Sequence, residues 1–523
     1  MFALALYLAI RSAWVTDDAF IAFNYSKHLA LGEGLRFNAG ESPPVEGYTQ
    51  LGWVLLVALI ERLRLEVVSA THVVEIATFL ALVAVAMAAT RRGSGSAAAL
   101  LAGLFVATAP TSAIWATGGL GTMLFALAIL VSTLAVLRAS GSWSLGLAIV
   151  STIAVTVVRF DGLWFAGLIV LGAGASGFVR ADRRLVRTAI TVGVAVAIGF
   201  ALQTWWRVEY HGDYVPNTVR AKLGTGTWRL ERGANYVLAY FLAIPTAAAL
   251  ALVTVVRAVR ERQDRDGPLL AVSATVVLGT FVHAVVSGGD FMPMWRLLVP
   301  AVAPLAIVLG STVVAIGRRA SGGDAAALVA AALVGWVPAS FGASLAPRSW
   351  FESVEFRPAL AGVSESRLHS AWREQIGTRI RDARILASAT GPGESIVLGA
   401  IGTTGYYTEL EIHDRFGLVD RDVARLVPAT PGGGPMPGHD RLAPIEFFAN
   451  RRPTYLATKF YPGEHPGTPL HDAFVTTPAY ATGDFVLVDI GVDAGFGIDG
   501  TLVLTRYRVA GTAADDGDPR ADD

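Results

Sequence analysis

Long apolar runs, separated by short polar segments, dominate residues 1–345. A helix that crosses a bilayer core of roughly 30 Å needs about 20 apolar residues. Runs of this kind, bounded by charges or by Gly and Pro clusters, predict eleven spanning helices whose boundaries are set to within a few residues. They lie near residues 1–15, 67–89, 97–113, 120–137, 143–158, 162–179, 188–205, 236–256, 269–287, 297–317 and 325–345.

Two apolar segments need separate interpretation. The run from Met1 is short, and it predicts a trimmed helix or the end of one that starts upstream. A signal peptide is the alternative, but no basic segment precedes the run and no small-residue cleavage site follows it. Residues 51–65, LGWVLLVALIERLRL, carry Glu61, Arg62 and Arg64 and would invert the side of every later loop if they spanned. They therefore predict an interfacial or re-entrant helix, or a lead-in to the next span.

The loops between the predicted spans fall into two sets by charge. Lys and Arg in short loops mark the cytoplasmic side of a membrane. Alternate loops carry Arg91, Arg92, Arg138, Arg180, Arg183, Arg184, Arg187, Arg257, Arg260, Arg262, Arg265, Arg318 and Arg319, with few acids. The opposite loops carry most of the unusual polar stretches, which predicts a multi-pass protein of the cell (inner or plasma) membrane with these stretches outside the cytoplasm.

The pattern changes after residue 345. Residues 366–389 combine a helical period with many charges, and the runs SIVLGAIG, PTYLATKF, DFVLVDIG and GTLVLTRYRV are typical of strands. The fold prediction is an α-helical polytopic membrane domain over 1–345, with a first extracytoplasmic loop at 16–66. A water-soluble extracytoplasmic α/β domain follows over 346–510, and residues 511–523 form a disordered tail.

Composition supports a membrane protein and excludes several chemistries. The chain is 53% hydrophobic and 16% charged, with a mean hydropathy of +0.51, whereas soluble domains are about a quarter charged. Its 42 Lys and Arg balance 42 Asp and Glu, so no global basic field predicts nucleic-acid binding. The absence of cysteine excludes thiolate catalysis, disulfides and Cys-ligated zinc.

Asp17 and Asp18 follow the first apolar run, where a helix is expected to begin. Thr16 or Asp17 would cap this helix and Gly32 would end it. The acids could simply complement the helix dipole, but one cap suffices and a long polar loop follows. Adjacent helical residues point about 100° apart, so only one of the two carboxylates can face a given substrate atom. We predict that one acts and the other supports it.

Three other loops on the same side combine charges with turn residues. VVRFDGLW holds Arg159 and Asp161 between two spans, as a functional pair or as a structural ion pair. HGDYVPNTVRAK ends in Arg220 and Lys222, which could contact an anion or form a basic surface loop. SGGDFMPMWRLLVP places Asp290 and Arg296 just before a span.

These motifs together resemble a known family. DDAFIAFNYSKHLALGEGLRFNAGE and VEGYTQLGW, then GGL and TMLF, RFDG, DYVPNTVRAK and GGDFMPMWRLLVP, occur in this order, and GAIGTTGYYTELEIHDRFGLVD and PGHDR follow. The chain resembles the GT-C membrane glycosyltransferases, in particular the mycobacterial terminal β-(1→2)-arabinofuranosyltransferase family. One departure is Gly121, because related sequences commonly carry an acid in that turn.

The resemblance implies transfer of a sugar, arabinofuranose by analogy, from a polyprenyl-phosphate donor to a cell-envelope glycan at the outer face of the membrane. A carboxylate would accept the proton of the acceptor hydroxyl, and cations would stabilise the departing phosphate. The residues do not choose between inversion and retention. The predicted catalytic residues are Asp17 and Asp18, and the predicted substrate-binding residues are Glu46, Tyr48, Arg159, Asp161, Asn217, Arg220, Lys222, Asp290 and Arg296, with Trp53 as a further aromatic face.

Several points stay open at this stage. Tyr406, His439 and Asp440, in the C-terminal domain, are candidates for an acceptor path, although Gly-rich connections usually only turn the chain. No cofactor is predicted; oxygen ligands could hold one divalent ion, but no ligand spacing demands it. The partners expected are the lipid-linked donor, the glycan and membrane lipid. The alternatives are another lipid-linked sugar, such as mannose or aminoarabinose, and a lipid-linked sugar transporter.

Overall fold

The structure of the chain is a computed structural model. It describes residues 1–222, 227–264, 266–317, 336, 346–426, 436–444, 447–448, 451, 453–462, 485–492 and 500–507. Two of the predictions, the last span at 325–345 and the tail at 511–523, lie outside the described residues, Trp336 excepted.

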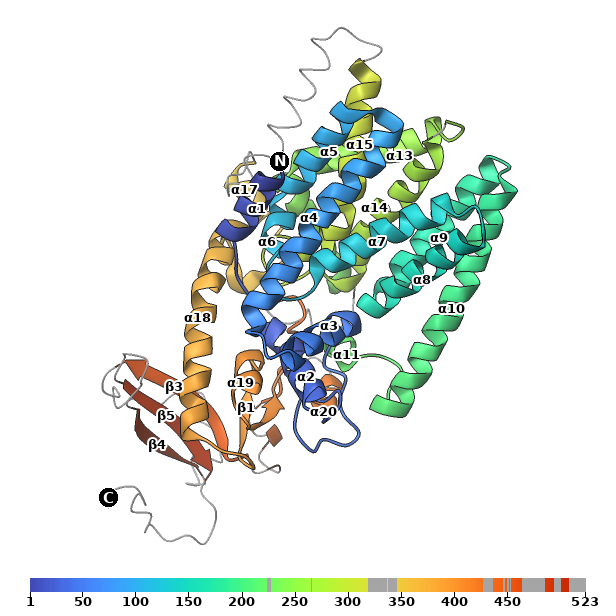
Figure 1. Cartoon of the computed structure of the whole chain (residues 1–523). Coiled ribbons are helices and arrows are strands. Elements are labelled where there is room, and N and C mark those ends of the chain that lie inside the picture. Colours follow the sequence, from blue (N-terminus) through green and yellow to red (C-terminus); the bar gives the residue numbers. More distant parts are fainter. Residues whose placement is uncertain are drawn as a thin grey trace.

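Apolar helices form a bundle that makes up most of the molecule (Figure 1). By length and composition, five helices of the described ranges could each cross a membrane, or six spans result if one bent pair is counted as one. These helices are α4 (Val67–Ser94), α9 (Gly162–Val179), α10 (Arg183–His211), α14 (Gly267–Ser287) and α15 (Val299–Gly317), the last preceded by η1 (Arg296–Leu298). Shorter apolar helices occupy four other predicted spans: α1 (Phe2–Arg11), α5 (Ser96–Thr108), α7 (Thr122–Arg138) and α8 (Ser142–Val158).

The predicted span at 236–256 is not one continuous helix. The chain forms two helices there, α12 (Trp228–Ala243) and α13 (Pro245–Arg260), which meet at 106°. Pro245 is the first residue of α13 and Ile244 before it has φ −131° and ψ 74°. A proline lacks the N–H that would continue the preceding helix, and it disfavours helical backbone at the residue before it. The break therefore follows from Pro245.

The first polar loop contains two helices. α2 (Asp17–Ala30) starts as predicted, because the hydroxyl of Thr16 accepts a hydrogen bond from the backbone N–H of Ala19 at 3.1 Å. Gly32 follows the end of α2 with a φ of +85°, where glycine is favoured. The segment at 51–65 forms α3 (Leu51–Arg62), which packs against α2, α4 and α8.

The C-terminal region combines helices with one mixed sheet beside the first loop (Figure 1). Strands β1 (Ser395–Leu398), β3 (Tyr455–Pro462), β4 (Phe485–Val492) and β5 (Gly500–Tyr507) occupy the four predicted runs, whereas β2 (Glu411–Asp414) was not predicted. The strand order is β2-β1-β3-β5-β4; β1 pairs in parallel with β2 and β3, and β5 pairs antiparallel with β3 and β4. The helices are α17 (Arg348–Glu352), η2 (Pro358–Leu360), α18 (Glu365–Ala389), α19 (Gly402–Tyr407) and α20 (Arg421–Ala424).

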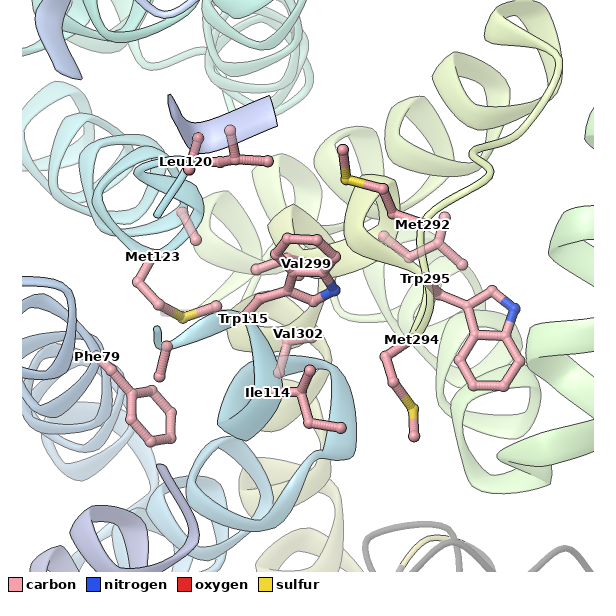
Figure 2. Packing of buried hydrophobic residues seen from close by; sticks show 14 of the residues in the cluster. Phe79, Ile114, Trp115, Leu120, Met123, Met292, Met294, Trp295, Val299 and Val302 are labelled. Atoms are coloured by element: carbon pink, nitrogen blue, oxygen red, sulfur yellow. The ribbon is translucent and has the colours of Figure 1, made fainter. Parts of the chain in front are cut away.

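A buried tryptophan fixes the loop between α14 and η1. Trp115 ends α6 (Pro110–Trp115), is fully buried, and donates its indole N–H to the carbonyl of Pro293 at 3.1 Å. Figure 2 shows it among Met123, Met292 and neighbouring side chains of this core. The guanidinium of Arg296 lies 5.5 Å from the centroid of the Trp115 ring. The core thus positions the segment that carries Asp290 and Arg296.

Candidate functional site

Asp17 and Asp18 occupy the first turn of α2 and have different surroundings. The carboxylate of Asp17 accepts hydrogen bonds from the backbone N–H of Gly402 at 3.0 Å, and from the N–H and the hydroxyl of Thr403 at 3.1 and 3.0 Å. Arg379 of α18 lies 3.7 Å from it. A Cβ at Gly402 would stand 1.9 Å from the Asp17 carbonyl oxygen, so only glycine permits this approach. Asp17 therefore joins α2 to the C-terminal region.

Asp18 instead lines two neighbouring cavities, and Ile21, Phe291 and Leu418 also belong to both linings. Its Oδ2 atom lies 3.5 Å from Nζ of Lys222, on α11 (Asn217–Lys222). Because both side chains remain partly exposed, this is a loose ion pair. Asp18 is consequently the carboxylate of the pair that faces open volume on two sides.

The first cavity, of about 340 Å³, is called the basic cavity here because three cationic side chains line it: Arg159, Lys222 and Arg296. Its wall is built by α2, the first loop at 47–50, the turn at 159–161, α11, the end of α14 and the loop at 289–297. All of these except α2 and α14 are polar segments between apolar helices. The fold thus gathers loops that are far apart in sequence around one volume.

Each arginine of the basic cavity is oriented by a carboxylate. Arg159 donates Nε and Nη2 to the two oxygens of Asp161 at 2.8 and 3.0 Å. Arg296 donates Nε to Asp290 at 2.8 Å. Burial acts to raise the pKa of the Asp161 carboxyl, but Arg159, His283 and the hydrogen bonds to the carboxylate together outweigh it and hold that pKa below its ordinary value. The bond to Asp290 uses Nε, which leaves the Nη groups of Arg296, a residue of the cavity lining, as further donors.

The second cavity, of about 600 Å³, is called the aromatic cavity because Trp14, Phe291, Trp372 and Phe416 line it. It lies between the start of α2, the stripe of α18 that runs from Trp372 to Arg379, and the loops at 399–401, 416–418 and 436–442. His439 stands here, with its ring centroid 4.3 Å from that of Phe291 and 4.6 Å from that of Phe416. Burial lowers the pKa of His439, even though the charge of Asp18 opposes the shift, so its imidazole is neutral at pH 7.

Most of the predicted substrate-binding residues line the basic cavity. They are Tyr48, Arg159, Asp161, Lys222, Asp290 and Arg296. Tyr48 is almost fully buried and its hydroxyl oxygen lies 3.4 Å from Nε2 of His211, so its role in the wall is largely one of packing.

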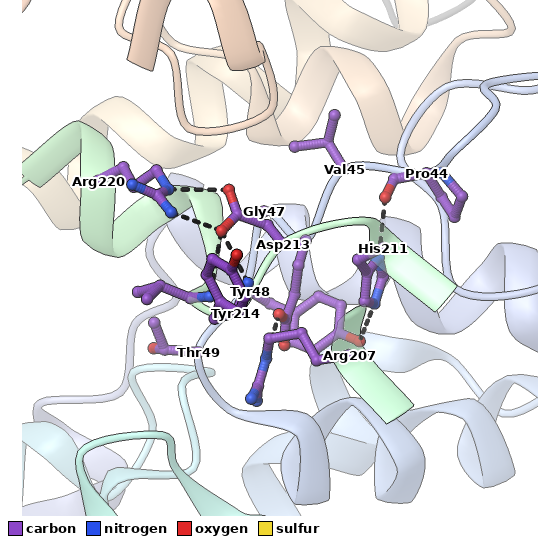
Figure 3. A network of polar contacts seen from close by, with 12 residues as sticks. Pro44, Val45, Gly47, Tyr48, Thr49, Arg207, His211, Asp213, Tyr214 and Arg220 are labelled. Carbon is purple, nitrogen blue, oxygen red and sulfur yellow. Dashed lines mark hydrogen bonds and ion pairs between the residues drawn. The ribbon is translucent and has the colours of Figure 1, made fainter. Parts of the chain in front are cut away.

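Three other predicted residues serve as anchors between segments, and the described linings do not include them. Glu46 accepts a hydrogen bond from Nε of the buried Arg207 at 2.6 Å, and burial raises the pKa of Glu46 to about 7. Asn217 donates to the carbonyls of residues 417, 418 and 420. Arg220 pairs with Asp213 through two hydrogen bonds (Figure 3).

Of the three candidates for the acceptor path, two line the aromatic cavity and one does not. His439 and Asp440 line the aromatic cavity, and Asp440 is held by two hydrogen bonds from the buried Arg232 at 2.8 and 3.0 Å. Tyr406 lies away from the described linings: its hydroxyl donates to Glu61 at 2.8 Å. Trp53 is fully buried and donates to the carbonyl of Gly119, so it offers no face to a sugar.

Sequence reasoning missed His283, Trp372, Gln375 and Arg379, which line the cavities. His283 lies inside an apolar span, and its Nε2 atom is 3.4 Å from Asp161. An ionisable residue within a span is a signal that could have identified it. The α18 residues sit in an ordinary amphipathic pattern, which contains no such signal.

Sequence reasoning also missed Glu75, which, like His283, is an ionisable residue within an apolar span. Glu75 binds the backbone of the turn that contains Gly121. This carboxylate of α4 is fully buried and accepts the N–H groups of Gly119 and Gly121 at 2.8 and 2.9 Å. Gly121 has a φ of +65°, and a Cβ there would come within 2.9 Å of the Trp53 ring. The turn thus takes its carboxylate from a neighbouring helix. In the described ranges, no group of three or more His, Asp or Glu side chains is placed to hold a metal ion.

The fold has a counterpart among solved structures. The chain is similar to ArnT from Cupriavidus metallidurans bound to undecaprenyl phosphate, with a TM-score of 0.59 and 13% identity over 97% of each chain. The chain has an ArnT-like GT-C fold. ArnT of the same organism in the apo state gives a TM-score of 0.55 and 14% identity over 96% of each chain. This confirms the predicted polytopic helical class with a C-terminal α/β region.

One family profile matches part of the chain. This profile, described as a domain of unknown function (DUF8728), matches residues 368–509, which include most of α18 and the sheet. No match to the chain is found among curated protein sequences.

Proposed function

We propose that the chain is a glycosyltransferase that moves a sugar from a polyprenyl-phosphate donor to a glycan acceptor, with Asp18 as the general base. The observation that carries this proposal is the position of Asp18 in the walls of two cavities, one of which holds three cations. A transferase that joins two substrates needs a proton acceptor between them. The ArnT structure with undecaprenyl phosphate supports a lipid phosphate as the donor's carrier.

In the proposed reaction, the acceptor hydroxyl oxygen attacks the anomeric carbon of the donor sugar. The bond from that carbon to the phosphate oxygen breaks, and the phosphate leaves with the electron pair. The proton of the hydroxyl passes to Asp18, whose carboxylate faces both substrates. Lys222 and Arg296 stabilise the charge that grows on the phosphate, which is the kind of preorganised interaction that contributes most to many enzymes. Asp290 orients Arg296, and Asp161 orients Arg159.

Arabinofuranose is proposed as the sugar because of the ordered motifs that resemble the arabinofuranosyltransferase family. The segments around the basic cavity carry most of those motifs: residues 18–22, 47–50, 159–161 and 289–297. We place the reaction at the outer face of the membrane, since the arginine-rich loops lie on the opposite side of the predicted topology.

The test is a transfer assay with purified protein in detergent. Polyprenyl-phosphoryl arabinofuranose, mannose and aminoarabinose are each incubated with a short arabinofuranoside, and mass spectrometry follows the acceptor. Extension by one pentose from the arabinofuranose donor is the expected result. Extension from another donor alone would keep the mechanism and change the sugar. Inactivity with all three donors, in protein that remains folded, would contradict the proposal.

A further inference from the structure

We infer that the aromatic cavity binds the end of a neutral glycan, and that one stripe of α18 selects it. This inference rests on the proposed function, because it gives Asp18 a second substrate to act on. The stripe comprises Trp372, Gln375, Ile376 and Arg379, which line the cavity. Their spacing of three, four and seven residues puts them on one face of a helix.

Aromatic side chains approach the cavity from three parts of the fold. Trp372 of α18 has its ring centroid 5.5 Å from that of Phe291 and 6.4 Å from that of Trp14. Phe416 and His439 add the third side. Rigid aromatic rings offer large apolar contact area at a small loss of side-chain entropy. A sugar ring has an apolar C–H face that suits such a surface.

Polar groups stand at the edge of the same surface, as hydroxyl recognition requires. Gln375 offers a carboxamide with donors and an acceptor, and Arg379 offers guanidinium N–H groups. The neutral imidazole of His439 can donate at one nitrogen and accept at the other. An alkyl chain would leave these groups unpaired on binding, which is unfavourable in a closed site.

The charges of the two cavities indicate which substrate each one takes. The described lining of the aromatic cavity has three carboxylates, Asp17, Asp18 and Asp440, and one arginine, Arg379, which lies 3.7 Å from Asp17. Each of these carboxylates has a cation beside it, Arg379, Lys222 or Arg232. Of these cations only Arg379 belongs to the described lining, so a phosphate-bearing acceptor would meet one cation there, and that cation is already paired. The basic cavity has three cations to three carboxylates. The anionic donor therefore fits the basic cavity and the uncharged glycan fits the aromatic cavity.

Asp18 lies between the aromatic cavity and the basic cavity, where a base could act on the two bound substrates. A glycan hydroxyl that projects from the aromatic cavity toward α2 meets Asp18 first and the basic cavity behind it. Two bound reactants held on either side of one base gain the rate advantage of fixed proximity. No lipid group of the acceptor is needed for this geometry.

The binding test uses the full-length protein in detergent without any donor. Saturation-transfer NMR or fluorescence titration follows a synthetic arabinofuranosyl pentasaccharide, with a mannosyl pentasaccharide as the second neutral probe. Trp372→Ala should weaken binding of the preferred probe about tenfold, and Gln375→Ala, at an exposed residue, about threefold. Thr378→Ala is the control, since Thr378 is exposed on α18 outside the stripe and should leave binding unchanged.

The outcomes separate this inference from the proposed function. In the transfer assay, Trp372→Ala and Gln375→Ala should raise KM for the glycan and leave KM for the donor unchanged. Absence of transfer with retained, Trp372-dependent glycan binding would overturn the proposed function alone. Unchanged glycan binding in folded Trp372→Ala and Gln375→Ala proteins would overturn the inference, as would tighter Trp372-dependent binding of a phosphorylated pentasaccharide.

Discussion

The basic cavity and the anchor formed by Glu46 and Arg207 both pair acidic with basic side chains, but they differ in access. In the anchor, Glu46 pairs with Arg207 at 2.6 Å and both side chains are about 4% exposed or less. In the cavity, Lys222 lies 3.5 Å from Asp18 and their side chains are 30% and 22% exposed. A charge whose partner is fixed and buried stabilises the fold, whereas a loosely paired charge in a cavity wall remains able to bind a ligand.

Helix α11 carries one cation of each kind two residues apart: Arg220 belongs to an ion pair outside the cavity, and Lys222 lines the cavity. Lys222→Met should lower kcat/KM by about 10²–10³, because it removes charge from the position of the leaving phosphate. Arg220→Met should change it by less than about threefold, since Arg220 pairs with Asp213 outside the cavity. Initial rates of transfer measure both. Equal losses in the two variants would break the distinction between cavity and anchor.

Loss of the ion pair between Glu46 and Arg207 should lower the free energy of unfolding rather than the rate of transfer. Arg207→Met should destabilise the protein by about 1–3 kcal/mol, because it leaves the buried Glu46 carboxyl without its hydrogen-bond partner, and the loss of the Arg207 charge favours protonation of Glu46. Thermal unfolding in detergent measures this change. Lys222→Met serves as the control and should cost less than about 1 kcal/mol, as expected for a partly exposed pair. A large loss of stability in Lys222→Met with none in Arg207→Met would contradict the assignment.

Asp17 lies between the two cases, because it belongs to the wall of the aromatic cavity and is also fixed. Asp17→Asn should weaken its bonds to Gly402 and Thr403 by about 1.5–3 kcal/mol, the range for hydrogen bonds to charged groups. Hydrogen exchange of the backbone amides at 402–403 should become faster, which an effect on catalysis alone would not produce. Unchanged exchange at these amides would show that Asp17 does not hold α19.

The smallest effect concerns pH and a carboxyl that belongs to neither lining. Asp414 of β2 is fully buried, and burial raises its pKa to about 7. The unfolded carboxyl titrates near about 4, so between roughly pH 4 and 7 the folded state binds more protons than the unfolded state. The contribution of Asp414 to stability therefore falls as pH rises through this window and is constant above it.

Comparison of the melting temperatures of wild type and Asp414→Asn from pH 4.5 to 8 isolates that contribution. The difference between the two proteins should change across the window and level off above pH 7. A difference that stays constant with pH would contradict the raised pKa.

The sequence predicted the elements whose signal is local. The helix at 366–389 and four strands carry clear periods, and Thr16 caps α2 as expected. β2, with only four residues and two charges, carries no such period. The break at Pro245 was available in the sequence, but hydropathy averaged over a window hides a single proline.

The site was predictable only as a set of loops. The partner of Asp17 lies 385 residues away, and the contact depends on a glycine that could not be distinguished from an ordinary turn residue. Glu46 is a loop carboxylate like Asp290, and Arg220 is a cation of α11 like Lys222, so only packing separates anchor from cavity. Trp372 and Gln375 belong to a region that sequence reasoning treated as a separate domain.

The most direct test of the account is the rate of sugar transfer in Asp18→Asn, measured beside Asp17→Asn at saturating donor and acceptor. Asparagine keeps the shape of the side chain and removes the base. The account predicts that Asp18→Asn lowers kcat by at least about 10²-fold in protein with an unchanged melting temperature, while Asp17→Asn retains more activity. Full activity in Asp18→Asn, or a greater loss in Asp17→Asn, would contradict it.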